Sequence, residues 1–185
     1  RSLSAMVLIE GGIGISIVYN LYKPLANDNK PQIIALVQLY KKAYIILALI
    51  ILVISLGLFT IIDKLMSTDV GKLEITTVYF IFVAKNIISY LNAYKWSLIS
   101  ADQKGYILAK NNLIFQILTA SFKIIILIVT KNYILFLAVE LFIFIIQNII
   151  NTKCVNKLYP YLKNKNKYSL DKNIKNNIIK NVKAM

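Results

Sequence analysis

The stretch "AYIILALIILVISLGLFTII", residues Ala43–Ile62, decides the fold class of this chain. Its 20 residues carry no charge, and a helix of that length extends about 30 Å, the thickness of the hydrocarbon core of a bilayer. A buried helix of a soluble protein normally keeps one polar face, and this stretch has none. The stretch therefore predicts a helix that spans a membrane.

The composition of the whole chain agrees with a membrane protein. Hydrophobic residues make up 58% of the 185 positions, whereas a soluble domain usually has about 45–50%. Cys154 is the only cysteine and histidine is absent, so we expect no disulfide framework, no metal site, no cofactor and no enzyme activity. The chain begins at Arg1 without a recognisable signal peptide, and we expect it to be an internal fragment of a longer protein.

Four other apolar segments accompany the central one, and short polar connectors separate them. The expected spans are residues 3–22, 43–62, 75–99, 107–129 and 133–155. Pro24 and Pro31 bracket the first connector, where a proline can stop or start a helix. The sequence therefore predicts an all-α integral membrane protein, with a bundle of about five transmembrane helices over residues 1–160.

The distribution of lysine indicates how these helices are oriented. The connectors contain four lysines in residues 23–42, two in 63–74, three in 95–110, one in 130–132 and nine in 153–185. Lysine-rich connectors face the cytoplasm by the positive-inside rule. We therefore expect a multi-pass protein of the cytoplasmic membrane, with its N-terminus outside and its C-terminal tail in the cytoplasm.

The tail, residues 161–185, is rich in asparagine and lysine. Leu170, Ile174, Ile178 and Val182 recur every four residues, which predicts a helix with one apolar stripe and Ser169 as its N-cap. This basic amphipathic segment is either a helix that lies on the anionic cytoplasmic leaflet or a cytoplasmic linker between two halves of a longer protein, and the two interpretations are compatible. Nucleic acid is not an expected partner, because the lysines are scattered without a base-stacking platform.

Polar residues inside the expected spans follow helical spacing. The four stripes are Gly12, Ser16 and Asn20, with Glu10 beside them; Lys85, Ser89, Asn92 and Trp96, with Lys95; Asn112, Gln116, Thr119 and Lys123; and Glu140, Gln147 and Asn151. Such stripes line a wet cavity if they converge, or they join helices by hydrogen bonds worth about 0.6 kcal/mol each. Single amides favour the second interpretation. The lysines favour the cavity, because a buried ammonium group needs water or a counter-ion.

The depth of two charged residues predicts an ion pair. Lys123 lies seven residues before Thr130, and Glu140 lies seven residues after Tyr133. Both therefore belong at about the same height on consecutive antiparallel helices. A Lys123–Glu140 ion pair is the expected result.

Glu10 is the charged residue of the first expected span, and it precedes the glycine-rich stretch 11–14. These glycines permit another helix to approach closely, but they are not a nucleotide-binding fingerprint, because no strand precedes them. At its depth Glu10 can meet Lys85 as a permanent partner, or it can exchange protons during a transport cycle. Glu10 and Glu140 are therefore the candidate ion-coupling residues.

Five stretches, in order, resemble the bacterial oligosaccharide flippases of polysaccharide biosynthesis, which belong to the multidrug/oligosaccharidyl-lipid/polysaccharide exporter superfamily. They are "IEGGIGISIVYNLYKPLAND" (9–28), "LYKKAY" (39–44), "SLISADQKGYI" (97–107), "TKNYILFL" (130–137) and "NKLYPYLK" (156–163). The resemblance covers nearly the whole chain. One departure is Gly11, where a larger apolar residue is expected.

The resemblance implies a transporter of 12–14 helices in two pseudo-symmetric lobes that works by alternating access. This chain then supplies the second to sixth helices of the first lobe, which is most of a six-helix lobe, and the linker that follows it. The implied substrate is a polyprenyl-pyrophosphate-linked oligosaccharide, moved from the cytoplasmic to the outer leaflet of a bacterial membrane. A polysaccharide polymerase and chain-length proteins are the implied partners, besides the lipid bilayer.

The polar residues of the spans fit such a substrate. Lysine is a point-charge phosphate binder, and amides offer donors and acceptors for sugar hydroxyls. The candidate substrate-binding residues are Lys85, Asn92, Lys95, Lys110, Asn112, Gln116, Lys123 and Gln147.

Other functions remain open at this point. A flippase for a lipid-linked cell-wall precursor is close in chemistry. A membrane polymerase or transferase that acts on lipid-linked sugars is a second alternative, although the longest connector, residues 63–74, is short for an active-site module. The lysines of the spans argue against an exporter of cationic drugs, and a purely structural bundle leaves these lysines unexplained.

Overall fold

The computed structural model describes residues 15–16, 18–65, 71–163, 166 and 168–183. Within these residues the secondary structure is helical, with no strand. A helical segment at residues 18–26 comes first. It is followed by α2 (Lys30–Leu65), α3 (Lys72–Ala101), α4 (Gly105–Thr130), α5 (Tyr133–Leu158), the 3₁₀ turn η1 (Pro160–Lys163) and α6 (Lys172–Lys183). The predicted all-α fold class is confirmed.

Four of the described helices, α2 to α5, are long and apolar enough to cross a membrane. Their apolar side chains are largely uncovered by protein: Ile117, Ile128 and Val129 of α4 are all well exposed. Lipid is the solvent that accepts such a surface, since hydrocarbon tails are as apolar as these side chains. The chain is a multi-pass membrane protein. The first expected span, residues 3–22, lies mostly outside the described residues.

The connector expected between the first two spans is largely helical. The segment at residues 18–26 ends in a tight turn, where the backbone N–H of Asn29 donates to the carbonyl of Pro24 (2.9 Å) and Asp28 has a φ of 47°. Asn29 then starts α2, because its side-chain oxygen accepts from the N–H of Gln32 (3.4 Å). Pro31 fits the first turn of α2, where its missing N–H has no helical partner in any case. The apolar stretch 43–62 is therefore the later part of a longer helix.

The chain divides into two compact units. The first unit comprises residues 1–43, 93–106 and 154–185, and the second comprises residues 44–92 and 107–153. Each unit thus contains part of α2, α3, α4 and α5, and is formed by separate stretches of the chain.

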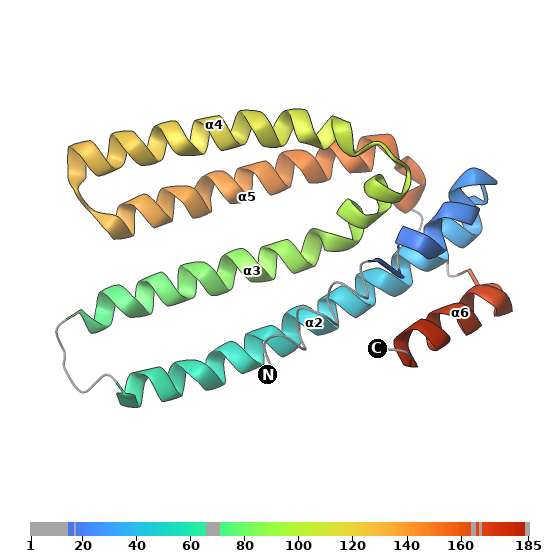
Figure 1. Cartoon of the computed structure of the whole chain (residues 1–185), viewed down its shortest axis with the longest axis horizontal. Helices are drawn as coiled ribbons and strands as arrows, with labels where there is room; N and C mark the ends of the chain where they lie inside the picture. The colour runs from blue at the N-terminus through green and yellow to red at the C-terminus, as the bar shows by residue number, and fades with distance from the viewer. Residues whose placement is uncertain (1–14, 17, 66–70, 164–165, 167, 184–185) are drawn as a thin grey trace. The chain divides into compact units, whose positions relative to one another are not determined.

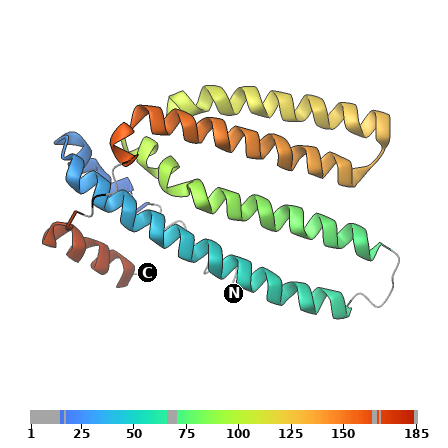
Figure 2. The same ribbon diagram turned by 180° about the vertical axis from the view of Figure 1, so that it is seen from behind.

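In the second unit α2 and α3 are antiparallel neighbours, and so are α4 and α5. Tyr79 of α3 donates its hydroxyl to the carbonyl of Ser55 in α2 (2.6 Å), and the ring centroid of Phe59 lies 5.2 Å from that of Phe80. The helices α4 and α5 run side by side (Figures 1 and 2). A short turn joins them, in which Lys131 has a φ of 50° and Asn132 caps α5 by accepting from the N–H of Leu135 (3.1 Å). This turn places the first residues of α5 beside the last residues of α4.

In the first unit the early turns of α2 form a buried centre. Five consecutive residues, Ile33 to Val37, are all buried. They cover more than one full turn, so protein surrounds the helix there on every side. Leu21, Leu98, Ile99 and Val155 are other nearly inaccessible apolar side chains among the described residues of this unit.

The tail docks onto the same part of α2 within the first unit (Figures 1 and 2). The side chain of Gln32 makes two hydrogen bonds to the backbone of the tail. Its Nε2 donates to the carbonyl of Ser169 (3.0 Å), and its Oε1 accepts from the N–H of Asp171 (3.1 Å). Gln38 donates to the carbonyl of Asn166 (3.1 Å). The predicted N-cap at Ser169 is wrong: α6 begins at Lys172, so Asp171 holds the cap position and its carbonyl accepts the first helical bond.

Candidate functional site

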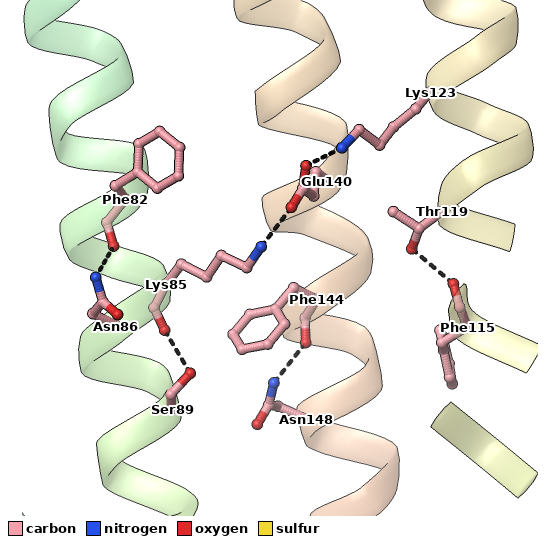
Figure 3. Close-up of polar contacts among 10 residues, drawn as sticks. All are labelled: Phe82, Lys85, Asn86, Ser89, Phe115, Thr119, Lys123, Glu140, Phe144 and Asn148. Carbon is pink, nitrogen blue, oxygen red and sulfur yellow. Dashed lines mark hydrogen bonds and ion pairs between the residues drawn. The ribbon is translucent and has the colours of Figure 1, made fainter. Parts of the chain in front are cut away.

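Three charged side chains meet in the second unit, and we call them the triad: Lys85 of α3, Lys123 of α4 and Glu140 of α5 (Figure 3). One carboxylate oxygen of Glu140 accepts from the ammonium of Lys85, and the other accepts from the ammonium of Lys123. The predicted Lys123–Glu140 ion pair is confirmed. The ion pair between Lys85 and Glu140 was not predicted. The partner expected for Lys85 was Glu10, which lies outside the described residues.

The turn between α4 and α5 explains the height of the triad. Lys123 precedes the last residue of α4 by seven positions and Glu140 follows the first residue of α5 by seven, so both stand about 10 Å from the turn. Aromatic rings lie beside both lysines. The ammonium of Lys123 is 4.2 Å from the ring centroid of Phe136, and that of Lys85 is 5.5 Å from the ring of Phe144. Cation–π attraction therefore adds to the ion pairs.

The triad carries one uncompensated positive charge. Its side chains are only partly exposed, at 33% for Lys85, 25% for Lys123 and 22% for Glu140. A charge inside a spanning helix is costly unless it is paired or faces water. One carboxylate neutralises one of the two lysines, so the site retains a net attraction for an anion.

A groove of about 470 Å³ opens beside the triad, lined by residues of α3, α4 and α5. Six of the predicted site residues line it: Lys85, Asn112, Gln116, Lys123, Glu140 and Gln147. Thr119 of the same predicted stripe, together with Ala120 and Phe144, completes the lining. Its charged residues are those of the triad, and a site with two lysines and one carboxylate suits an anion rather than a metal ion.

An amide network joins α4 to α5 at one end of the groove. The side-chain oxygen of Asn112 accepts from both Gln147 Nε2 and Asn151 Nδ2, each at 2.8 Å. Asn151 is 5% exposed and accepts a longer bond from Asn111 (3.4 Å). These amides join helices, as the packing interpretation of the stripes expects.

Some polar groups of the groove have no such packing role. Gln116 makes no side-chain hydrogen bond among the described residues, and no hydrogen bond there uses the amide nitrogen of Asn112. Thr119 donates to a carbonyl of its own helix, at Phe115 (2.7 Å), and its hydroxyl can still accept. The groove therefore offers neutral donors and acceptors next to a cationic end.

Three predicted residues lie outside the groove. Asn92 accepts from Thr152 (3.1 Å) and donates to the carbonyl of Ile88 (3.2 Å), so it joins α3 to α5. Lys95 belongs to the first unit, half-buried, with its ammonium 5.7 Å from the ring of Tyr94. Lys110 is exposed on α4. Of the four lysines expected to bind phosphate, two reach the groove.

A second polar cluster, in the first unit, was missed by the sequence reasoning. Asp102 accepts from the hydroxyl of Tyr159 and from the ammonium of Lys104, both at 2.7 Å. Burial and the hydrogen bond to Asp102 raise the pKa of Tyr159 well above its usual range. Burial, together with the negative charges of Asp102 and Asp28, raises the pKa of Tyr161 to about 12. These contacts fasten the α3–α4 turn to the chain after α5.

Another hollow, of about 630 Å³, lies between the start of α3 and the α4–α5 turn. Its polar lining residues are Glu74, Thr130, Lys131, Asn132 and Tyr133. None of the predicted site residues lines it.

Comparison with known proteins adds no assignment. No family model, no curated protein and no solved structure matches this chain. The function proposed for the chain therefore depends on its residues, on their geometry and on the resemblance described above.

Proposed function

We propose that this chain is part of a flippase that moves a polyprenyl-pyrophosphate-linked oligosaccharide from the cytoplasmic to the outer leaflet of a bacterial cytoplasmic membrane, for assembly of cell-surface polysaccharide. The observation that carries the proposal is the triad: two lysines share one carboxylate beside a groove between spanning helices. A lipid carrier presents its pyrophosphate to the protein from within the bilayer, so an anion site among spanning helices suits it.

The groove matches the two chemical parts of such a headgroup. Lys85 and Lys123 are point charges for the pyrophosphate, and a strongly hydrated ammonium can also release its cargo. Gln116 and Asn112 supply donors and acceptors for sugar hydroxyls. On this proposal the anion binds at the triad, and the first sugars bind toward the amide network.

The two faces of α4 support a hydrated groove. Gln116 and Thr119 line it, whereas the neighbouring residues Ile117 and Leu118 are exposed without lining it. Apolar exposure on a spanning helix is expected toward lipid, and polar exposure is expected toward water or substrate. On this proposal the polar stripe of α4 faces the substrate, and the apolar residues beside it face lipid.

Replacement of Lys123 by Met, with Lys110→Met as the matched control, tests the proposal. Both lysines lie on α4, but only Lys123 lines the groove. We expect Lys123→Met to weaken binding of a polyprenyl-pyrophosphate oligosaccharide at least tenfold in nanodiscs that hold the complete transporter, and Lys110→Met to change it less than twofold. Equal effects of the two substitutions would contradict a binding role for the groove.

A further inference from the structure

Glu140 stands where the anion of a ligand would stand. We propose that its carboxylate is a built-in substitute for that anion: it occupies the site between Lys85 and Lys123 while the groove is empty, and a phosphate group displaces it on binding. The inference rests on the proposed function, because it assigns a competing residue to the same groove. It concerns which group occupies the site when no ligand is bound and how tightly the site binds a phosphate group.

The geometry of the triad fits an exchange of one anion for another. Each oxygen of Glu140 accepts from a different lysine, and the two lysines come from different helices, α3 and α4 (Figure 3). A phosphate group also presents pairs of oxygens on one central atom, so it can accept from the same two ammonium groups. Neither lysine needs to leave the groove for the exchange.

The charge balance favours displacement once a phosphate is present. With Glu140 in place the triad has a net charge of +1, and the described lining of the groove includes no other acid. A phosphate dianion in its place neutralises both ammonium groups at once. Gln116 also lines the groove, and its side-chain amide can donate to the released carboxylate.

The exposure of the triad makes it accessible to a ligand in the groove. The three side chains of the triad are 22–33% exposed and border the groove. A partly exposed ion pair can be reached by a competing anion, whereas a buried one cannot.

An internal competitor lowers the apparent affinity for the ligand, because only the fraction of molecules with a vacated site is competent to bind. Removal of the competitor therefore tightens binding. Substitution of Glu140 should therefore raise the affinity for the ligand, whereas substitution of a binding-site residue usually lowers it.

Titration of the full chain in phosphatidylcholine nanodiscs with farnesyl pyrophosphate measures this effect. We expect Glu140→Gln to bind the probe at least tenfold more tightly than the wild type does. Glu140→Asp has a side chain too short to hold both lysines equally, and we expect an intermediate affinity. Glu74→Gln, an acid of the same unit outside the groove, is the matched control and should leave the affinity unchanged.

Parallel titrations with inorganic pyrophosphate and with added phosphatidylglycerol separate a soluble phosphate, a membrane lipid and an isoprenyl carrier as the source of the anion. Wild-type binding without tightening in Glu140→Gln would overturn the inference and leave the proposed site standing. Absence of binding in both would overturn the inference and the proposed function together. If Glu140→Gln does not fold, an affinity of Glu140→Asp equal to or weaker than that of the wild type would overturn the inference.

Discussion

Two clusters in this molecule use one carboxylate to hold two donors, and they differ in net charge. Asp102 holds a phenol and one ammonium, so that cluster is neutral, and its tyrosine, Tyr159, is 3% exposed. Glu140 holds two ammonium groups, so the triad keeps a positive charge, and it borders an open groove. A neutral cluster fastens chain segments, whereas a cluster with a net positive charge beside a groove attracts an anionic ligand.

The largest expected effect is a loss of protein stability when the triad is disrupted. Glu140→Ala leaves two partly buried ammonium groups without a counter-ion, and we expect the free energy of unfolding to fall by about 2–3 kcal/mol. Lys123→Met in the same chain should restore part of the loss, because it removes one of the unpaired charges. Unfolding in detergent, followed by circular dichroism, measures both variants. A loss in the double variant as large as the sum of two independent losses would refute coupling through the triad.

The fastening cluster should respond to loss of one hydroxyl. Tyr159→Phe removes the hydrogen bond to Asp102 and keeps the buried ring, so we expect a loss of about 1 kcal/mol. The matched control is Tyr161→Phe, at a neighbouring position that makes no hydroxyl hydrogen bond among the described residues. Denaturant titration compares the two. Equal stabilities of both variants would show that the Asp102–Tyr159 contact does not fasten the turn.

Alkaline pH should weaken the same cluster. The folded-state pKa values of Tyr159 and Tyr161 are raised, the latter to about 12, above about 10 for an unfolded tyrosine. Their contribution to stability is therefore complete below pH 10 and is lost as the pH rises above it, because the unfolded chain gives up its protons first. The wild type should lose more stability than Tyr159→Phe between pH 9 and pH 11. Parallel pH profiles would contradict the assignment.

The smallest expected effect concerns docking of the tail. Gln32 makes two hydrogen bonds to the tail backbone directly before α6, and Gln38 donates to the carbonyl of Asn166, farther from that helix. We expect Gln32→Ala to speed amide hydrogen exchange in α6 by several-fold, and Gln38→Ala to speed it less, since exposed hydrogen bonds are each worth about 0.5–1 kcal/mol. Unchanged exchange in both variants would show that the tail is held by other contacts.

Local pattern and length predicted the parts of this structure that depend on one helix or on two consecutive ones. The uncharged stretch 43–62 is sufficient to identify a spanning helix, and equal distances from one short turn are sufficient to pair Lys123 with Glu140. Periodicity also placed Gln116 and Thr119 on one face, and both line the groove.

The parts that sequence could not supply depend on which distant segments become neighbours. Lys85 reaches Glu140 across 55 positions, and Asp102 meets Tyr159 across 57, and neither spacing leaves a local signal. Lys110 was expected to bind phosphate because of its charge, but it lies outside the helical spacing of the α4 stripe and does not line the groove. The predicted N-cap at Ser169 was wrong because a distant contact decides the conformation there. The carbonyl of Ser169 accepts a hydrogen bond from Gln32, far away in the sequence.

Accessibility of α4 to water tests the central claim, that its polar face lines a hydrated substrate groove, most directly. In a Cys154→Ser background, single cysteines at Gln116, Thr119, Ile117 and Leu118 would be treated with a membrane-impermeant thiol reagent from either side of the membrane. We expect labelling at positions 116 and 119, little at 117 and 118, and slower labelling at 116 and 119 when lipid-linked oligosaccharide is present. Equal labelling at all four positions, or none at any, would contradict the claim and leave the polar stripes as packing contacts between helices.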